Sequence, residues 1–184
     1  EPIIIGTVAR ITPWKGLESS IKAAKKLSDE DVPFRWLFAG DTTLGSEKYL
    51  AELKNLVKEL NLENQISFLG WVENMKDLYR SLDVLVHLPI EPEPFGLVIV
   101  EAMSNGVPVI STTGGADEYV LDGGGWIIQS GDINSVSKII MDLVDNPDEL
   151  SHRSKQSSNY AVENFNFDQY ISQIISLYSE LGGL

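Results

Sequence analysis

The sequence has no cysteine, only two histidines, and no apolar run approaching the roughly 20 residues that a membrane-spanning helix needs. Without cysteine, disulfides, thiolate nucleophiles and thiolate metal sites are excluded. His87 and His152 lie far apart in the sequence, so they do not form the closely spaced pair of a structural zinc site. We therefore expect no metal site and no membrane span, and the first residues lack the pattern of a signal peptide.

Basic residues are also scarce. The chain of 184 residues carries 14 Lys and Arg against 27 Asp and Glu, a net charge of −13. This balance argues against a nucleic-acid partner and against general attraction to anionic membranes. The length fits one domain, 1–184, with a sizeable core. Because the chain starts at Glu1-Pro2 and enters an apolar stretch at once, we expect a piece of a longer cytoplasmic protein.

Short apolar stretches alternate with helical patterns over residues 1–130, and the tail, 131–184, is wholly helical in pattern. Such alternation predicts an α/β fold with a six-stranded parallel sheet covered by helices on both faces. The predicted strands are 3–9, 34–39, 65–69, 83–88, 107–111 and 126–128. The predicted helices are 12–27, 46–60, 74–81, a helix opening at 94 and ending at Asn105-Gly106, a turn at 117–120, and then 133–145, 147–164 and 167–181.

Ligands of parallel sheets bind beyond the carboxyl ends of the strands. Four polar or glycine-containing segments follow predicted strands and should therefore lie on one rim. These segments are 10–15, 70–71, 93–97 and 113–115. Their convergence predicts a binding site at that rim.

The segment 91–103 combines a loop with a helix that is apolar on nearly every side. Pro94 suits the first helical position, which would leave the amides of Phe95, Gly96 and Leu97 free to bind an anion. A carboxylate within such a helix, Glu101, needs a partner. The alternative is that Glu101 only marks a solvent-facing stripe.

Two cations follow the first strand. Thr12-Pro13 predicts a helix start, which places Lys15 in the first turn, where a cation opposes the helix dipole. An anion bound on the same rim would offset this unfavourable interaction, and Arg10 would bind the same anion from the end of the strand. The alternative is that both are solvated surface cations.

The spacing within the segment suggests which anion could bind. Glu101 lies five residues beyond Gly96, roughly 7.5 Å along a helix. This is about the distance from the phosphates of a nucleotide to its ribose hydroxyls. A carboxylate can accept hydrogen bonds from these hydroxyls. Glu93 would then lie on the opposite side of a bound diphosphate.

These residues together resemble a known family. The stretch from Glu93 to Glu101 resembles the E-x7-E motif of retaining GT-B glycosyltransferases, especially family 4, and Arg10-x4-Lys15-Gly16 resembles the donor-phosphate pair of that family. The resemblance covers residues 3–130 in the right order. Further similar segments are 105–110, 113–115 with Glu118, and the turn Gly70-Trp71-Val72 near the nucleotide base.

The resemblance implies the C-terminal, Rossmann-like half of a GT-B fold, which binds a nucleotide-sugar donor and transfers the sugar with retention and without a metal. The nucleotide sugar would be a co-substrate, and no other cofactor is implied. Arg10 and Lys15 would hold the diphosphate, Glu101 the ribose and Glu93 the sugar. The implied donor-binding residues are Arg10, Lys15, Gly70, Trp71, Val72, Glu93, Phe95, Gly96, Leu97 and Glu101, with Arg10, Lys15 and Glu93 also catalytic.

GT-B enzymes have a second, N-terminal domain that binds the acceptor, and this chain contains no counterpart of it. The implied partners are that domain and an unknown acceptor, and the implied location is cytoplasmic or, through the missing domain, at the inner membrane surface. The apolar face of helix 167–181 would be partly uncovered without it, and the isolated chain should not transfer sugar. Alternatives are a non-catalytic nucleotide-binding or interaction module, and a GT-B epimerase or phosphorylase.

Three other residues have simpler interpretations. We interpret His87 as a core or edge histidine with a satisfied ring rather than a ligand contact. Trp71 is interpreted mainly as a packing residue, with stacking on a base as the alternative. Asp41 is interpreted as part of a turn, although its position at a strand end would also allow it to face the site.

Overall fold

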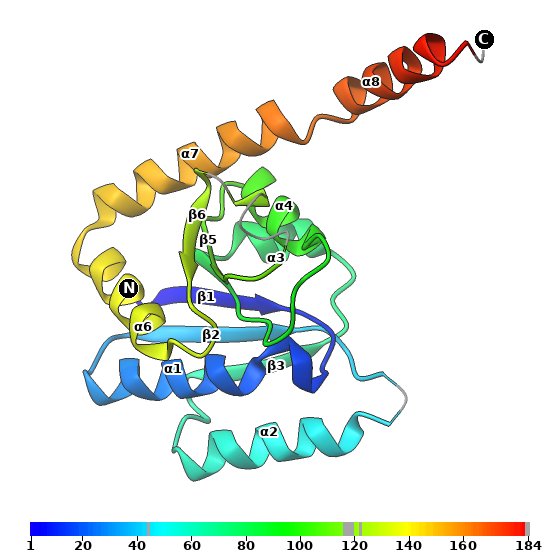
Figure 1. Ribbon diagram of the computed structural model, residues 1–184. Helices are drawn as coiled ribbons and strands as arrows, with labels where there is room; N and C mark the ends of the chain where they lie inside the picture. Colours follow the sequence, from blue (N-terminus) through cyan, green and yellow to red (C-terminus); the bar gives the residue numbers. More distant parts are fainter. Residues whose placement is uncertain (44, 116–119, 122, 183–184) are drawn as a thin grey trace.

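One parallel sheet organises the protein (Figure 1), whose computed structural model describes residues 1–43, 45–115, 120–121 and 123–182. Its strands are β1 (Ile3–Val8), β2 (Phe34–Ala39), β3 (Ile66–Gly70), β4 (Val84–His87), β5 (Val109–Thr112) and β6 (Gly125–Ile128). All neighbouring pairs are parallel, in the order β3-β2-β1-β4-β5-β6. The predicted six-stranded parallel sheet is confirmed. The order reverses between β1 and β4, the position at which such sheets bind ligands.

Helices cover both faces of the sheet because the apolar side chains of each strand alternate between the faces. Ile3 and Ile5 of β1 belong to one core and Ile4 to the other. The first core is covered by α1 (Leu17–Asp29), α2 (Glu47–Glu59) and α6 (Ile133–Asp145). The second is covered by α3 (Met75–Arg80) and α4 (Leu97–Ser104), and α7 (Pro147–Asn164) packs on α4.

The first helix does not begin where its sequence suggested. Pro13–Lys15 form a short 3-10 turn, Gly16 follows at φ 68°, and only then does α1 begin at Leu17. Thr12 makes no side-chain capping bond. The prediction that Lys15 lies in the first turn of this helix is therefore wrong, since Lys15 ends the preceding turn. The dipole argument for an anion at Lys15 does not apply.

We expect Gly16→Ala to lower the free energy of unfolding by at least about 3 kcal/mol. A left-handed conformation costs a non-glycine residue about 1–2 kcal/mol, and a Cβ at this position would lie 1.8 Å from the Leu88 carbonyl oxygen. Urea unfolding measures the change. Gly131→Ala is the matched control, because its φ is also positive, 81°, and no atom lies within 4 Å of its added Cβ. Equal losses in the two variants would contradict the close packing at Gly16.

The helix after β4 also begins later than predicted. Gly96, at φ 78°, precedes α4, so Pro94 lies in the loop and is not the first helical residue. The end of α4 was predicted correctly. Gly106 adopts φ 76°, and its amide and that of Val107 bond to the carbonyls of Met103 and Ala102, which closes the helix.

The helix starts that the structure describes either have a side-chain cap or lack one. α3, α6, α7 and α8 (Phe167–Glu180) each follow an Asn or Asp whose side chain accepts a backbone N–H of the first turn. α1 and α4 instead follow Gly16 and Gly96, which provide no side-chain cap, and α2 follows Ser46, whose side chain makes no capping bond. The two helices that start nearest the reversal of strand order are thus among those without such a cap.

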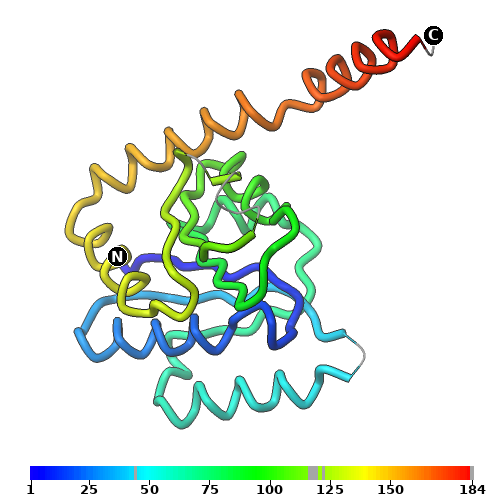
Figure 2. Tube along the Cα trace, viewed as in Figure 1, coloured from blue at the N-terminus to red at the C-terminus, as the bar shows by residue number. Residues whose placement is uncertain are grey.

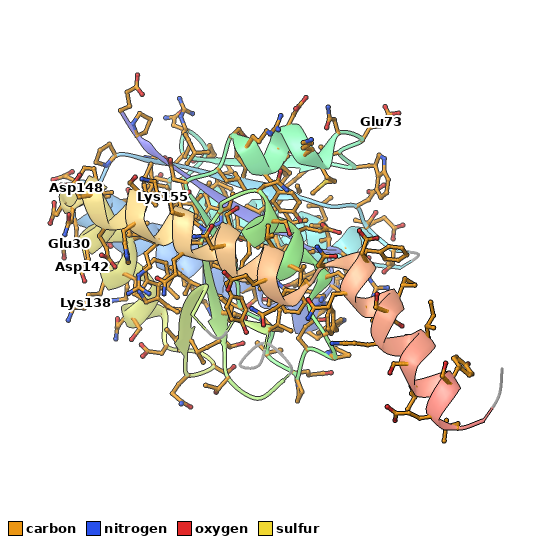
Figure 3. All side chains as sticks on the ribbon, turned by 90° about the horizontal axis from the view of Figure 1, so that it is seen from above. Glu30, Glu73, Lys138, Asp142, Asp148 and Lys155 are labelled. Carbon is orange, nitrogen blue, oxygen red and sulfur yellow. The ribbon has the colours of Figure 1, made fainter. Side chains whose placement is uncertain are left out.

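The last helix, α8, extends away from the body in the views of Figures 1 and 2. None of its residues is buried. Figure 3, from above, shows the end of α8 standing clear of the other elements, whereas Phe167 and Tyr170 near its start line a cavity with Leu97 of α4. Its exposed apolar residues are Phe167, Tyr170, Ile171, Ile175, Leu177 and Tyr178. The uncovered apolar face predicted from the sequence is therefore present.

Candidate functional site

Three loops meet beyond the carboxyl ends of β1, β4 and β5. The amide of Ile90, after β4, donates to the carbonyl of Trp14, after β1, at 2.8 Å. Gly115, after β5, lies so close that a Cβ there would be 2.5 Å from the backbone nitrogen of Glu93. Lys15 of the first loop also donates to Glu93 of the second, so three of the four rim segments predicted from the sequence, 10–15, 93–97 and 113–115, are in contact. The turn predicted at 117–120, apart from its last residue, and Glu118 lie outside the described residues.

Among the described carboxylates of this rim, Glu93 is the most enclosed. Its side chain is 10% exposed and accepts from Lys15 Nζ, whose side chain is 12% exposed. The same oxygen, Oε2, lies 3.1 Å from Nε2 of the buried His87. Lys15 also lies 3.9 Å from the centre of the Trp14 ring. Lys15 is therefore paired with Glu93, and the predicted contact of Lys15 with a bound anion would have to form beside or in place of this pair.

The partners of Glu93 keep it ionised. The hydrogen bond from His87 and the ion pair with Lys15 lower the pKa of Glu93 to about 2, although burial opposes the change. At neutral pH this group is a carboxylate, so it can accept hydrogen bonds from hydroxyl groups. It cannot act there as a general acid.

Glu101, the second carboxylate of the predicted pair, is exposed, yet it has a specific partner. The hydroxyl of Tyr79, which is 2% exposed, donates to Glu101 Oε2 at 2.8 Å. Burial and the bond to this carboxylate raise the pKa of Tyr79, so the phenol remains a donor. The bond ties Glu101 to α3 while leaving the carboxylate open to solvent, which suits a group that meets a ligand.

A cavity of about 430 Å³ opens beyond the ends of β1, β2 and β3. Arg10 lines it, is exposed, and forms no ion pair with another described residue. Trp71, 78% exposed, Val72 and Asp41 also line the cavity. The interpretation of Trp71 as a packing residue is wrong, since most of its surface is exposed. The cavity reaches α4 at Val98, so it lies beside the start of that helix.

The start of α4 differs in detail from its prediction. Because the helix begins at Leu97, its N–H groups without an intrahelical acceptor are those of Leu97 and Val98, and the N–H of Ile99 donates to the Gly96 carbonyl. The side chain of Phe95 packs edge-on against Phe165 after α7, with ring centres 6.3 Å apart. Leu97 is 66% exposed. An anion at this helix end would meet backbone amides rather than side chains.

Sequence reasoning missed the partners that hold the carboxylates, which are Lys15 and His87 for Glu93 and Tyr79 for Glu101. His87 was expected to have a satisfied ring, which is confirmed, but its partner Glu93 was not identified. Tyr79 carried no sequence signal beyond its place on a short helix. Its bond to Glu101 joins α3 to α4, and such a contact depends on how the helices pack on the sheet.

The part of the chain that the structure describes contains neither a candidate metal site nor a candidate membrane-spanning helix. No group of three or more His, Cys, Asp or Glu side chains among these residues could hold a metal ion. None of the described helices combines the length and apolar character needed to span a membrane.

Sequence comparison places this geometry among known proteins. The family model "Glycosyl transferases group 1" matches residues 1–161. The lipopolysaccharide core biosynthesis mannosyltransferase LpsB of Rhizobium meliloti is 29% identical over 181 residues. The N-acetyl-alpha-D-glucosaminyl L-malate synthase of Bacillus anthracis is 32% identical over 171 residues. The matches cover 96% and 91% of this chain but 51% and 42% of those proteins, so the chain spans about half the length of the curated relatives it matches.

Solved structures have the same fold. HepE of Anabaena, in complex with UDP and glucose, superimposes with a TM-score of 0.90 at 27% identity, over 97% of this chain and 48% of that one. The C-terminal domain of the group 1 glycosyl transferase LpcC from Francisella tularensis gives a TM-score of 0.81 at 24% identity. That match covers 90% of this chain and 87% of the LpcC domain, which shows that the fold also occurs as a separately solved domain.

Proposed function

Because this chain belongs to the glycosyl transferases group 1 family, we propose that it binds the nucleotide-sugar donor of a retaining, metal-independent glycosyltransferase. The observation that carries the proposal is the arrangement of segment 93–101. Glu93, in the loop before α4, is held by Lys15 and His87, and Glu101, within α4, is held by Tyr79. The cavity lined by Arg10 lies beside the same helix start. Relatives and structural neighbours support this reading, since HepE was solved with UDP and glucose.

In this proposal each group of residues binds a different part of the donor. The nucleotide base would enter the cavity near Gly70, Trp71 and Val72. Glu101 would accept the ribose hydroxyls, as acidic residues of dinucleotide sites do. The diphosphate would lie at the start of α4, over the amides of Gly96 and Leu97, with the amide of Phe95 close by. Arg10 and Lys15 would supply its counter-charges.

This arrangement also suggests how transfer is assisted. As the bond from the sugar to the diphosphate breaks, negative charge grows on the departing phosphate oxygens. Fixed cations and amides that face those oxygens stabilise this charge without any metal. Arg10, Lys15 and the α4 amides would serve this purpose, and Glu93 would hold the sugar by accepting its hydroxyls. With Glu93 ionised, the two carboxylates do not form the acid and nucleophile pair of a glycoside hydrolase.

We further propose that the acceptor is bound by a second Rossmann-like domain of the same protein, since about half the length of the relatives has no counterpart in this chain. The exposed apolar residues of α8 are suited to pack on such a domain. The acceptor would be a glycan, a lipid or a small molecule, at the cytoplasmic side of the cell or at the inner membrane surface. On this basis the isolated 184-residue chain binds donor without transferring sugar.

The test of this function is a thermal-shift panel with UDP-glucose, UDP-N-acetylglucosamine, GDP-mannose and ADP-glucose. At 100 times its dissociation constant a ligand adds about 2.7 kcal/mol of stability, which for a chain of this size raises Tm by roughly 5–10 °C. One class of nucleotide should give this shift. A flat response to all four donors at millimolar concentration would refute donor binding.

The panel is followed by a test of Glu101. Glu101→Ala is expected to reduce the preference for UDP over 2′-deoxyuridine diphosphate by about tenfold, because the carboxylate no longer accepts the ribose hydroxyls. Titration calorimetry measures both affinities. Glu59→Ala, an exposed glutamate of α2, makes the same change in net charge and should leave the preference unchanged. An unchanged preference in Glu101→Ala would show that Glu101 does not bind the ribose.

A further inference from the structure

His87 is a buried polar residue that the proposed function does not yet use. It is the last residue of β4 and is 2% exposed. Its Nε2 lies 3.1 Å from Glu93 Oε2, across six residues of chain that include the proline-rich loop. The bond therefore joins a rigid strand of the sheet to a carboxylate that lies in a loop.

The two contacts of Glu93 share one oxygen. Lys15 Nζ and His87 Nε2 both meet Oε2. Among the described residues no hydrogen bond reaches the other oxygen, Oε1. The backbone of Glu93 is itself backed by Gly115, where even a Cβ would not fit. The carboxylate is thus held from one side, and its other oxygen stays available as an acceptor.

The two partners differ in how firmly they can hold Glu93. Lys15 is a long, flexible side chain whose charge the proposed diphosphate would also attract. His87 has a short, buried side chain at the end of β4. In the tautomer with the hydrogen on Nε2, its ring donates a hydrogen bond from that nitrogen. A flexible glutamate side chain loses conformational entropy when it is fixed. A hydrogen bond that already orders Glu93 in the free protein reduces the entropy that is lost when the ligand binds.

We propose that His87 is a positioning residue, which donates its Nε2–H to Glu93 Oε2 and thereby aims Oε1 at the hydroxyl groups of the donor sugar. His87 does not touch the donor, and it acts through Glu93. The proposal rests on the proposed function in that it takes the ligand of Glu93 to be the sugar of a nucleotide sugar. It adds a residue that sets how strongly the sugar, as distinct from the nucleotide, is recognised.

The test separates the sugar from the nucleotide. Affinities of UDP-glucose against UDP, and of GDP-mannose against GDP, are measured by calorimetry on this chain and on two variants. In His87→Leu the advantage that the sugar confers should fall about tenfold, while the affinity for the free nucleoside diphosphate changes less than about threefold. In His87→Gln, whose amide can donate from a similar position, the advantage should return to within about threefold of the wild type. If His87→Leu does not fold, His87→Asn replaces it, since its amide is too short to reach Glu93.

A second measurement needs no ligand. A 13C NMR titration of the Glu93 carboxyl should show its midpoint rising by at least about one pH unit in His87→Leu, and by less in His87→Gln. A full sugar advantage in His87→Leu, or no recovery in His87→Gln, would overturn the positioning role. Equal affinity of the wild type for both nucleotide sugars and their nucleotides would also overturn it. If the wild type binds no nucleotide, the proposed function fails, and the NMR titration alone then decides whether His87 holds Glu93.

Discussion

Lys15→Ala should weaken the binding of uridine diphosphate by at least about tenfold, and more than Arg10→Ala does. A charge-assisted hydrogen bond to phosphate contributes about 1.5–3 kcal/mol. Lys15 is 12% exposed, whereas Arg10 is exposed to solvent, where its charge is better screened. Removing Lys15 also takes the counter-charge from Glu93, which would then repel the diphosphate. Calorimetry at fixed ionic strength measures the affinities.

The double variant Lys15→Ala/Glu93→Gln sharpens this expectation. If repulsion by Glu93 adds to the loss, the double variant should bind uridine diphosphate more tightly than Lys15→Ala alone. Lys54→Ala, an exposed lysine of α2, controls for the change in net charge. A loss in Lys15→Ala no greater than that in Lys54→Ala would show that the diphosphate does not meet this side chain.

Glu93→Gln should lower the free energy of unfolding by about 3 kcal/mol at pH 7. The pKa of Glu93 is lowered from 4.5 to about 2 in the folded protein, and each unit of difference corresponds to 1.36 kcal/mol. The group is only 10% exposed, so solvent screens little of this contribution. For a chain of this length the loss corresponds to a decrease in Tm of roughly 6–12 °C.

The effect should depend on pH in one direction. Because the folded pKa is the lower one, the stabilisation is complete above about pH 4.5 and is lost as the pH falls towards about 2. Urea unfolding of wild type and variant at pH 7, 5 and 3 should therefore give two similar differences and then a smaller one. Glu59→Gln serves as the control on an exposed glutamate. A difference that stays constant down to pH 3 would mean that the charge of Glu93 does not stabilise the fold.

Regular elements were predictable because their side chains repeat at fixed periods. The strand 34–39 and the helices 133–145 and 147–164 were predicted with the bounds that the structure has. Helix starts were less predictable, since Thr12-Pro13 and Pro94 are good local start signals that the left-handed glycines Gly16 and Gly96 override. These glycines act through the loops around them, a context that the local sequence does not contain.

The candidate site was predictable to a similar degree. The rim was found, since parallel strands bring their carboxyl ends together. The partners across it were not, because Lys15 and Glu93 are 78 residues apart and Tyr79 and Glu101 are 22 apart. Such contacts depend on strand order and on the packing of α3 beside α4. The cation expected to be free for an anion therefore proved to be paired with a carboxylate.

The glycines before α1 and α4 have a consequence for the balance between stability and function. At α3, α6, α7 and α8 an Asn or Asp side chain closes the helix start and contributes about 1 kcal/mol to the folded state. At these two starts the fold forgoes that contribution, and at Gly16 an Asn or Asp would not fit, because its Cβ would lie 1.8 Å from the Leu88 carbonyl oxygen. A bound diphosphate would accept hydrogen bonds from the N–H groups at the start of α4, so the substrate would take the place of the missing side-chain cap. Substitutions chosen only to stabilise this rim would then compete with the donor.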